Sequence, residues 1–198
     1  MIIEIEEIAN ILLSKKIIIN GCVNVGSCEC EELLDAYNKM GVKTENILWV
    51  DDLPDKVFSA TSRGIPSVAN NCSVANNCSV ANNCSVANNC SVDTIENPEN
   101  VYVDKIYQTS ITMDTFFERN NIDASKYNFW KLDIKGAELL VLQGAMKSIK
   151  NVKALYVEVN SAVITQLDVF LAPYNFKRYL TNMTIHKCGD ALYILDIT

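Results

Sequence analysis

Strand-like and helix-like segments alternate along most of this chain, and this alternation is the feature that most restricts its fold. Short runs rich in β-branched residues precede longer segments whose apolar residues recur every three or four positions. Such an order predicts an α/β sheet of mostly parallel strands, because a helix usually supplies the crossover between parallel neighbours. The chain has 198 residues, of which 49% are hydrophobic, so we expect one domain over 1–198.

The amino-terminal quarter predicts a first strand–helix–strand unit. A strand is expected to begin at residue 17 and end at Gly26, a helix at 29–40 to follow, and a second strand at 46–50 to end beside Asp51, 25 residues after Gly26. Within the first run, Asn20-Gly21 could instead form a two-residue hairpin turn, which would divide that strand.

The carboxyl-terminal half predicts a second unit of the same kind. A short strand is expected at 101–103, and Thr112 can cap a helix that extends to residue 121. The remaining expected elements are strands at 129–134, 154–159, 176–180 and 191–197 and helices at 137–149 and 163–172. The two strands at the end of the chain predict an antiparallel edge on the otherwise parallel sheet.

A hexapeptide, Ser-Val-Ala-Asn-Asn-Cys, occurs four times between Ser67 and Cys90 and is followed by Ser91 and Val92. Asparagine pairs favour turns and valine favours strands, so a unit could form a short strand and a bend, a hairpin or part of a small solenoid. Units of six residues bury little surface, and a loosely ordered loop also fits them. We interpret 67–92 as an insertion or replacement within the domain.

The charge of the chain restricts its partners. A formal net charge of -7 argues against nucleic acid as a partner, because nucleic-acid-binding proteins usually carry basic surfaces. The first twenty residues interrupt their apolar positions with glutamates and lysines, so they predict neither an export signal nor a membrane span. We therefore expect a cytoplasmic protein that has no membrane partner.

Eight cysteines could indicate disulfides or metal binding, but four of them belong to the repeat. These four recur every six residues, which is not the paired spacing of a zinc site. We expect reduced thiols and no metal. A redox or metal-binding cysteine module would require the repeat to oxidise or to take up metal.

Polar residues follow the predicted strands at the edge where open α/β sheets bind ligands. Gly26 would let the backbone approach a ligand closely, and Asp51 could accept hydrogen bonds from the two hydroxyls of a ribose. An aspartate at a strand end can equally cap a helix or lie in solvent.

Four segments carry a resemblance to a known family, and they lie at 113–116, 131–138, 143–145 and 156–159. They read MDTF, KLDIKGAE, QGA and YVEV, and they are similar to the LDxF, K-x-D-(I/V)-(E/Q)-G-x-E, K-G-A and E-(V/I) pattern of FkbM-type methyltransferases. The resemblance implies a Rossmann-like class I methyltransferase sheet and S-adenosyl-L-methionine as cofactor. The repeat could leave this sheet incomplete.

The resemblance also implies a cofactor site in the amino-terminal half. Asn24-Val25-Gly26-Ser27-Cys28 takes the place of the family motif D-(I/V)-G-A-(N/H), so the motif acid has become an amide. The implied cofactor-binding residues are Asn24, Gly26, Ser27 and Asp51.

Two alternatives remain for this site. A competing register aligns Asn20 with the motif acid, and Asp52 could replace Asp51 as the ribose ligand.

The implied reaction transfers a methyl group to a hydroxyl of a sugar or small metabolite. A carboxylate near the end of the strand at 129–134 could remove the hydroxyl proton, so Asp133 and Glu138 are the catalytic candidates. Glu138 could instead serve only as a favourable charge in the first turn of its helix. His186, in a loop before the last strand, could also be the base.

Two departures from the family pattern bear on activity. The repeat occupies the region of the family's third strand and of a loop that would enclose the adenine, and Lys135 stands where the family has Glu or Gln. A cation there would stabilise the ionised forms of Asp133 and Glu138. The alternative function is a catalytically inactive remnant that acts as a structural or interaction protein.

Overall fold

The computed structural model describes residues 3–26, 30–51, 67–69, 111–134 and 136–196. Its strands are β1 (Cys22–Val25), β2 (Ile47–Asp51), β3 (Ser67–Ala69), β4 (Phe129–Leu132), β5 (Ala154–Asn160), β6 (Phe176–Met183) and β7 (Cys188–Leu195). They form one sheet in the order β3-β2-β1-β4-β5-β7-β6. Neighbours from β3 to β5 are parallel, whereas β7 runs antiparallel to both β5 and β6. The predicted mostly parallel sheet with antiparallel pairing near one edge is confirmed.

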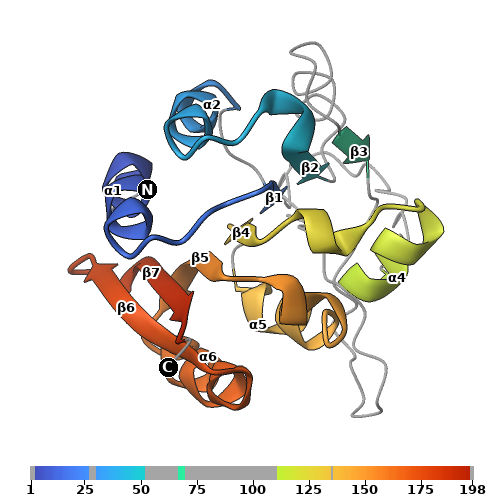
Figure 1. The fold of residues 1–198 in the computed structure, drawn as a ribbon. Coiled ribbons are helices and arrows are strands. Elements are labelled where there is room, and N and C mark those ends of the chain that lie inside the picture. The colour runs from blue at the N-terminus through green and yellow to red at the C-terminus, as the bar shows by residue number, and fades with distance from the viewer. Residues whose placement is uncertain (1–2, 27–29, 52–66, 70–110, 135, 197–198) are drawn as a thin grey trace, which may run out of the picture.

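Helices cover both faces of this sheet (Figure 1). They are α1 (Ile5–Ser14), α2 (Cys30–Lys39), α4 (Met113–Arg119), α5 (Glu138–Gln143) and α6 (Ile164–Leu171), with 3-10 turns at Thr44–Asn46, Ala124–Lys126, Ser148–Asn151 and Ala172–Tyr174. One buried cluster packs α1 and α2 against the sheet, and the other packs α4, α5 and α6 against its opposite face. The fold therefore has three layers.

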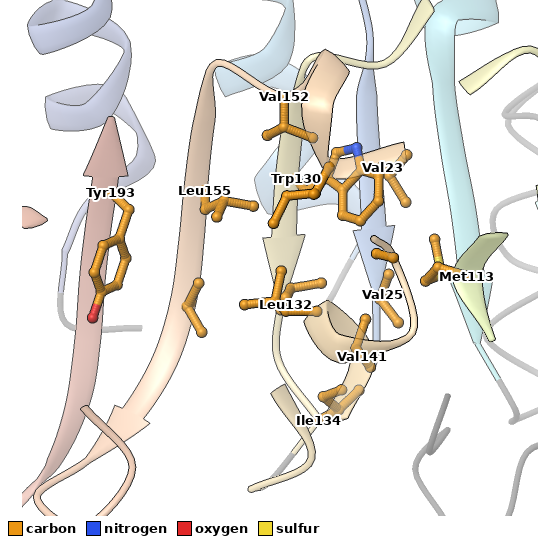
Figure 2. Close-up of a cluster of buried hydrophobic side chains, with 14 of the residues drawn as sticks. Val23, Val25, Met113, Trp130, Leu132, Ile134, Val141, Val152, Leu155 and Tyr193 are labelled. Atoms are coloured by element: carbon orange, nitrogen blue, oxygen red, sulfur yellow. The ribbon is translucent and has the colours of Figure 1, made fainter. Parts of the chain in front are cut away.

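Successive residues of β1 enter different cores, which explains the continuous apolar run in the sequence. Cys22 belongs to the cluster under α1 and α2, and Val23 and Val25 belong to the cluster on the other face. Figure 2 shows Val23 and Val25 beside Trp130 of β4 in that second cluster. A strand buried on both faces loses the polar alternation of a half-exposed strand.

The chain before β1 differs from the prediction in two ways, because it contains a helix and because the strand begins at Cys22 rather than at residue 17. Residues 5–14, for which the sequence analysis predicted no helix, form α1, whose buried face consists of Ile5, Ile8, Ala9 and Leu12. Asn20-Gly21 forms no hairpin. The carbonyl oxygen of Gly21 instead accepts hydrogen bonds from the backbone N–H groups of Asn128 and Phe129, which places it beside the start of β4.

The helix predicted at 137–149 ends early, because a carboxylate accepts the hydrogen bonds that backbone N–H groups of a longer helix would donate to helix carbonyls. α5 ends at Gln143, and the N–H groups of Lys147 and Ser148 donate to the carboxylate of Asp114, each at 2.9 Å. The hydroxyl of Ser148 donates to the same carboxylate at 2.6 Å. Asp114 therefore ties α4 to the turn after α5.

The first copy of the repeat contributes to the sheet. Its Ser67, Val68 and Ala69 form β3 and pair in parallel with Trp49, Val50 and Asp51 of β2. Three residues of the region interpreted as an insertion or replacement thus form a strand. The rest of the repeat and the strand predicted at 101–103 lie outside the described residues.

Candidate functional site

The ends of three adjacent strands bring the predicted site residues to one level of the sheet. Val25 of β1 is in register with Val50 of β2 and with Leu132 of β4. The next residue along each strand is Gly26, Asp51 or Asp133, respectively. These three residues therefore share the carboxyl edge of the sheet, although they are far apart in the sequence.

Gly26 holds two of these strand ends close together. It has a φ of 96°, and its N–H donates to the carbonyl oxygen of Val50 at 3.0 Å. A Cβ at this position would collide with the carbonyl oxygen of Asp133. Since both the backbone conformation and the close approach exclude other residues, this position requires glycine.

Asn24 is fully buried one residue before Val25. Its Nδ2 donates to the carbonyl oxygen of Gly26 at 3.0 Å, and its Oδ1 has no hydrogen-bond partner among the described residues. Asn20, the alternative motif position, lies before the amino end of β1, where its N–H donates to Oδ1 of Asn128. Asn24 therefore lies near the carboxyl edge of the sheet, whereas Asn20 lies near the opposite edge.

A buried ion pair lies on β4 at the same edge. The Lys131 side chain is 2% exposed, and its Nζ lies 2.9 Å from Oδ2 of Asp133, whose side chain is 28% exposed. A buried ammonium group needs a close anionic partner to offset its lost hydration. Lys131 thus fixes one oxygen of the Asp133 carboxylate and leaves that group partly open to solvent.

Glu138 stabilises the loop between β4 and α5. Its side chain is buried, and its Oε1 accepts hydrogen bonds from the N–H groups of Ile134 and Gly136, both at 3.1 Å. Burial raises the pKa of Glu138, which opposes the ionised form. The cation expected to favour that form was Lys135, which lies outside the described residues.

A cavity of about 240 Å³ opens beside this loop. Its lining residues are Gly136, Glu138, Glu158, Val159, Asn160 and Cys188. Behind it, Tyr156 donates a hydrogen bond from its hydroxyl to Oδ2 of Asp190 at 2.8 Å, and Glu158 is in register with Asp190. Glu158 and Asp190 also line a small pocket together with Lys131 and Asp133, so carboxylates from β5 and β7 lie near Asp133.

The methyltransferase FkbM domain model matches residues 23–190 of this chain. The chain belongs to that family. The match includes every described residue of the site, whereas α1 lies before its first residue. No curated protein sequence matches the chain.

Two solved structures share the fold of this FkbM domain at low sequence identity. One is a Streptococcus pneumoniae protein, assigned to the tRNA (m1A22) methyltransferases, in complex with S-adenosyl-L-methionine; it is 12% identical, with 100% of this chain and 75% of that chain covered and a TM-score of 0.50. The other is a protein of the NADB-Rossmann superfamily from Streptococcus agalactiae, 13% identical over 98% of this chain and 70% of that chain, with a TM-score of 0.50. At such identities the likeness supports the Rossmann-like fold alone.

Two further candidate residues of the FkbM domain are not placed in this cluster by the described structure. Ser27 lies outside the described residues. His186 is exposed in the turn between β6 and β7, where its backbone N–H donates to Oγ1 of Thr184 at 3.2 Å, and it does not line the 240 Å³ cavity.

Lys131 and Glu158 were not predicted as site residues, although both stand in the segments that resemble the family. The available signal was a single lysine inside the apolar strand sequence Phe-Trp-Lys-Leu, because a charge in such a strand requires a specific partner. Among the described parts of the chain, no cluster of His, Cys, Asp and Glu could hold a metal ion. None of the described helices has the length and apolar character that a membrane crossing requires.

Proposed function

We propose that this FkbM-domain chain transfers a methyl group from S-adenosyl-L-methionine to a hydroxyl oxygen of a sugar or small metabolite. The observation that carries the proposal is the common level of Gly26, Asp51 and Asp133 at the carboxyl edge of β1, β2 and β4. Ligands of open α/β sheets bind at this edge. Membership in a methyltransferase family supplies the reaction class and agrees with the expected cofactor.

The residues at the edge fit a nucleoside-containing cofactor. Gly26 leaves the end of β1 without a side chain, and the buried Oδ1 of Asn24 has no donor among the described residues. A carbonyl oxygen in that state can accept a hydrogen bond from an amine or amide of a ligand. Asp51 is proposed as the ribose ligand, and Ser27, which follows Gly26 in the sequence, as a further cofactor ligand. Asp52 remains the alternative to Asp51.

When bound, S-adenosyl-L-methionine supplies an electrophilic methyl carbon on a sulfonium centre and leaves as S-adenosylhomocysteine. A carboxylate at this edge of the sheet would take the hydroxyl proton of the acceptor that receives the methyl group. Asp133 is the proposed proton acceptor, since Lys131 orients one of its oxygens and the group is partly exposed. Positioning of the acceptor against the methyl carbon contributes most of the rate.

Glu138 is proposed to border the acceptor and to keep the loop after Asp133 in place. It lines the 240 Å³ cavity, yet its Oε1 already accepts two backbone hydrogen bonds. The cavity and a net charge of -7 favour a small uncharged or cationic acceptor over a nucleic acid.

Calorimetric titration of S-adenosylhomocysteine into the purified, reduced protein tests the cofactor site without knowledge of the acceptor. We expect saturable binding with a dissociation constant of about 1 µM, which corresponds to roughly -8 kcal/mol. The Asp51→Ala variant should lose this binding. Asp35→Ala, which removes an exposed carboxylate of α2, is the matched control and should bind as the unmodified protein does.

Absence of binding by the folded, unmodified protein would overturn the enzymatic proposal and favour the inactive remnant. Equal loss in Asp51→Ala and Asp35→Ala would overturn only the assignment of the ribose ligand.

A further inference from the structure

A second cavity lies at the opposite edge of the sheet from the proposed active site. It has a volume of about 530 Å³ and lies where the end of α1 meets β6, β7 and the start of β5. The register places Ala154, the first residue of β5, beside Ile194 near the end of β7, and Lys177 of β6 on the other side of Ile194. Its size is within the range of small-molecule sites.

Four lysines from three separate segments line this cavity. They are Lys15, Lys16, Lys153 and Lys177, and the lining contains one carboxylate, that of Asp196, which pairs with Lys177. This excess of positive charge stands out in a chain with a net charge of -7. Like charges gathered in a concave surface raise the local concentration of anions.

Arg178 also lines the cavity but does not add to its available positive charge. Its guanidinium group donates to both carboxylate oxygens of Asp168, at 3.1 and 3.0 Å, and to Oγ1 of Thr181. Lys15, Lys16 and Lys153, which form no ion pair with the described residues, therefore supply the free charge, while the charge of Lys177 is partly offset by Asp196.

The backbone around the lysines is fixed by its own hydrogen bonds. At the end of α1, the N–H groups of Lys15, Lys16 and Ile17 donate to the carbonyl oxygens of Ile11, Leu13 and Leu12. Lys153 is held between strands, because its carbonyl oxygen accepts from the N–H of Leu195 at 2.8 Å. Because these carbonyl oxygens at the end of α1 already accept backbone hydrogen bonds, they are weaker competitors than a bound anion for the lysine ammonium groups.

Apolar side chains complete the lining and indicate an organic ligand. Ile17, Ile194 and Leu195 line the cavity with Tyr179, whose ring centroid lies 4.2 Å from Nζ of Lys15. A phosphate ion alone would leave these surfaces uncovered. We propose that the cavity binds a small organic di- or triphosphate, with its phosphates at the four lysines and its organic part against Tyr179 and the isoleucines.

Titration calorimetry with cytidine triphosphate and with inorganic pyrophosphate tests this proposal, because neither probe contains the adenosyl group of the proposed cofactor. We expect saturable one-to-one binding of both, tighter for cytidine triphosphate. Lys153→Gln/Lys177→Gln should weaken both affinities by about tenfold or more, since it removes two charge-assisted contacts. Lys43→Gln/Lys126→Gln removes the same charge from exposed positions outside the cavity and should change them by less than about threefold.

Three results would overturn the proposal: no saturable binding, an equal loss of affinity in both double variants, or displacement of cytidine triphosphate by S-adenosylhomocysteine. The last would assign the probe to the carboxyl edge of the sheet. Equal affinity for the two probes would overturn the contact with the organic part and leave an inorganic diphosphate as the ligand.

Discussion

Gly26 and Gly41 have similar backbone conformations, with φ values of 96° and 80°, but different surroundings. A Cβ on Gly26 would collide with the carbonyl oxygen of Asp133, whereas a Cβ on Gly41 would have nothing within 4 Å. Any side chain at either position costs about 1–2 kcal/mol for the left-handed backbone. Only at Gly26 must two strands also separate.

Gly26→Ala should therefore destabilise the protein more than Gly41→Ala does. We expect about 1 kcal/mol for Gly41→Ala and about 3 kcal/mol or more for Gly26→Ala, measured by urea unfolding. Gly26→Ala should also abolish binding of S-adenosylhomocysteine, and Gly41→Ala should leave it intact. Equal losses of stability would contradict the close approach of β1 and β4.

Burial of Glu138 predicts a pH dependence of stability with a defined sign. Its pKa is raised in the folded state, so between the unfolded value near 4.5 and the higher folded value the folded protein binds more protons. Stability from this group is therefore full below about pH 4.5 and is lost as the pH rises through the folded pKa. Glu138→Gln, which keeps an oxygen acceptor, should gain stability relative to the unmodified protein between pH 4.5 and pH 8.

Urea unfolding at several pH values measures this difference. Glu138→Ala serves as the comparison, because it leaves the N–H groups of Ile134 and Gly136 without their acceptor. It should cost about 2 kcal/mol near pH 4.5, and this cost should decrease as the pH rises, since the unmodified protein then loses the stability that its Glu138 contributes. A Glu138→Gln variant whose stability relative to the unmodified protein falls as the pH rises would contradict the raised pKa.

The sequence allowed some of the candidate site to be predicted and not the rest, for a physical reason. Asn24, Gly26 and Asp133 lie near the carboxyl ends of predicted strands, and the parallel register brings these strand ends together. The partners of Lys131 and the neighbours of Glu158 depend on strand order and side-chain direction. Those are properties of the assembled sheet, so local patterns did not reveal them.

At the scale of elements, the four strands predicted after residue 128 are present as β4 to β7, because β-branched and aromatic runs indicate buried strands. β6 extends to Met183 rather than to residue 180, and β7 covers Cys188–Leu195 rather than 191–197. The predicted end of the helix at residue 149 was wrong, because α5 ends at Gln143. Beyond it, the N–H of Lys147 donates to the carboxylate of Asp114, 33 positions earlier in the chain, instead of to a helix carbonyl. α1 was not predicted, although its apolar residues recur at helical spacing. The charged residues between them were interpreted only as evidence against a membrane span or an export signal.

The pairing of β3 with β2 predicts that repeat copies can replace one another. Deletion of 73–90 removes three copies and leaves the Ser67–Ala69 strand, so stability should change by less than about 1 kcal/mol, mainly through loop length. Prolines at Val68 and Ala69 should cost about 2–3 kcal/mol in this single-copy chain, because they remove ladder donors.

In the four-copy chain the same two prolines should cost less, since Ser73-Val74-Ala75 has the same sequence as Ser67–Ala69 and could pair in its place. Thermal unfolding of the single-copy and four-copy chains, each with and without the two prolines, measures both costs. Equal costs in the two backgrounds would show that only the first copy can pair with β2.

For the whole molecule, α1 is as much a part of the fold as the matched domain, although it precedes residue 23, where the family match begins. Three of its buried side chains, Ile5, Ile8 and Leu12, contribute roughly 5–9 kcal/mol by burial, which is comparable to the total stability of a typical domain. A chain limited to 23–198 should therefore lack cooperative unfolding, as followed by circular dichroism.

A milder change tests the same packing without removing the helix. Leu12→Ala should cost about 2–4 kcal/mol because Leu12 is 1% exposed, and Leu13→Ala should cost less than about 0.5 kcal/mol because Leu13 is 58% exposed. Similar costs would contradict the placement of α1 against the sheet.

The strand formed by the first repeat copy has a consequence for inheritance. Each unit of six residues corresponds to six codons, so gain or loss of one unit during DNA replication keeps the reading frame. Whatever the number of units, the first one still offers Ser-Val-Ala to β2. Alleles that differ in the number of copies should thus encode chains with the same sheet.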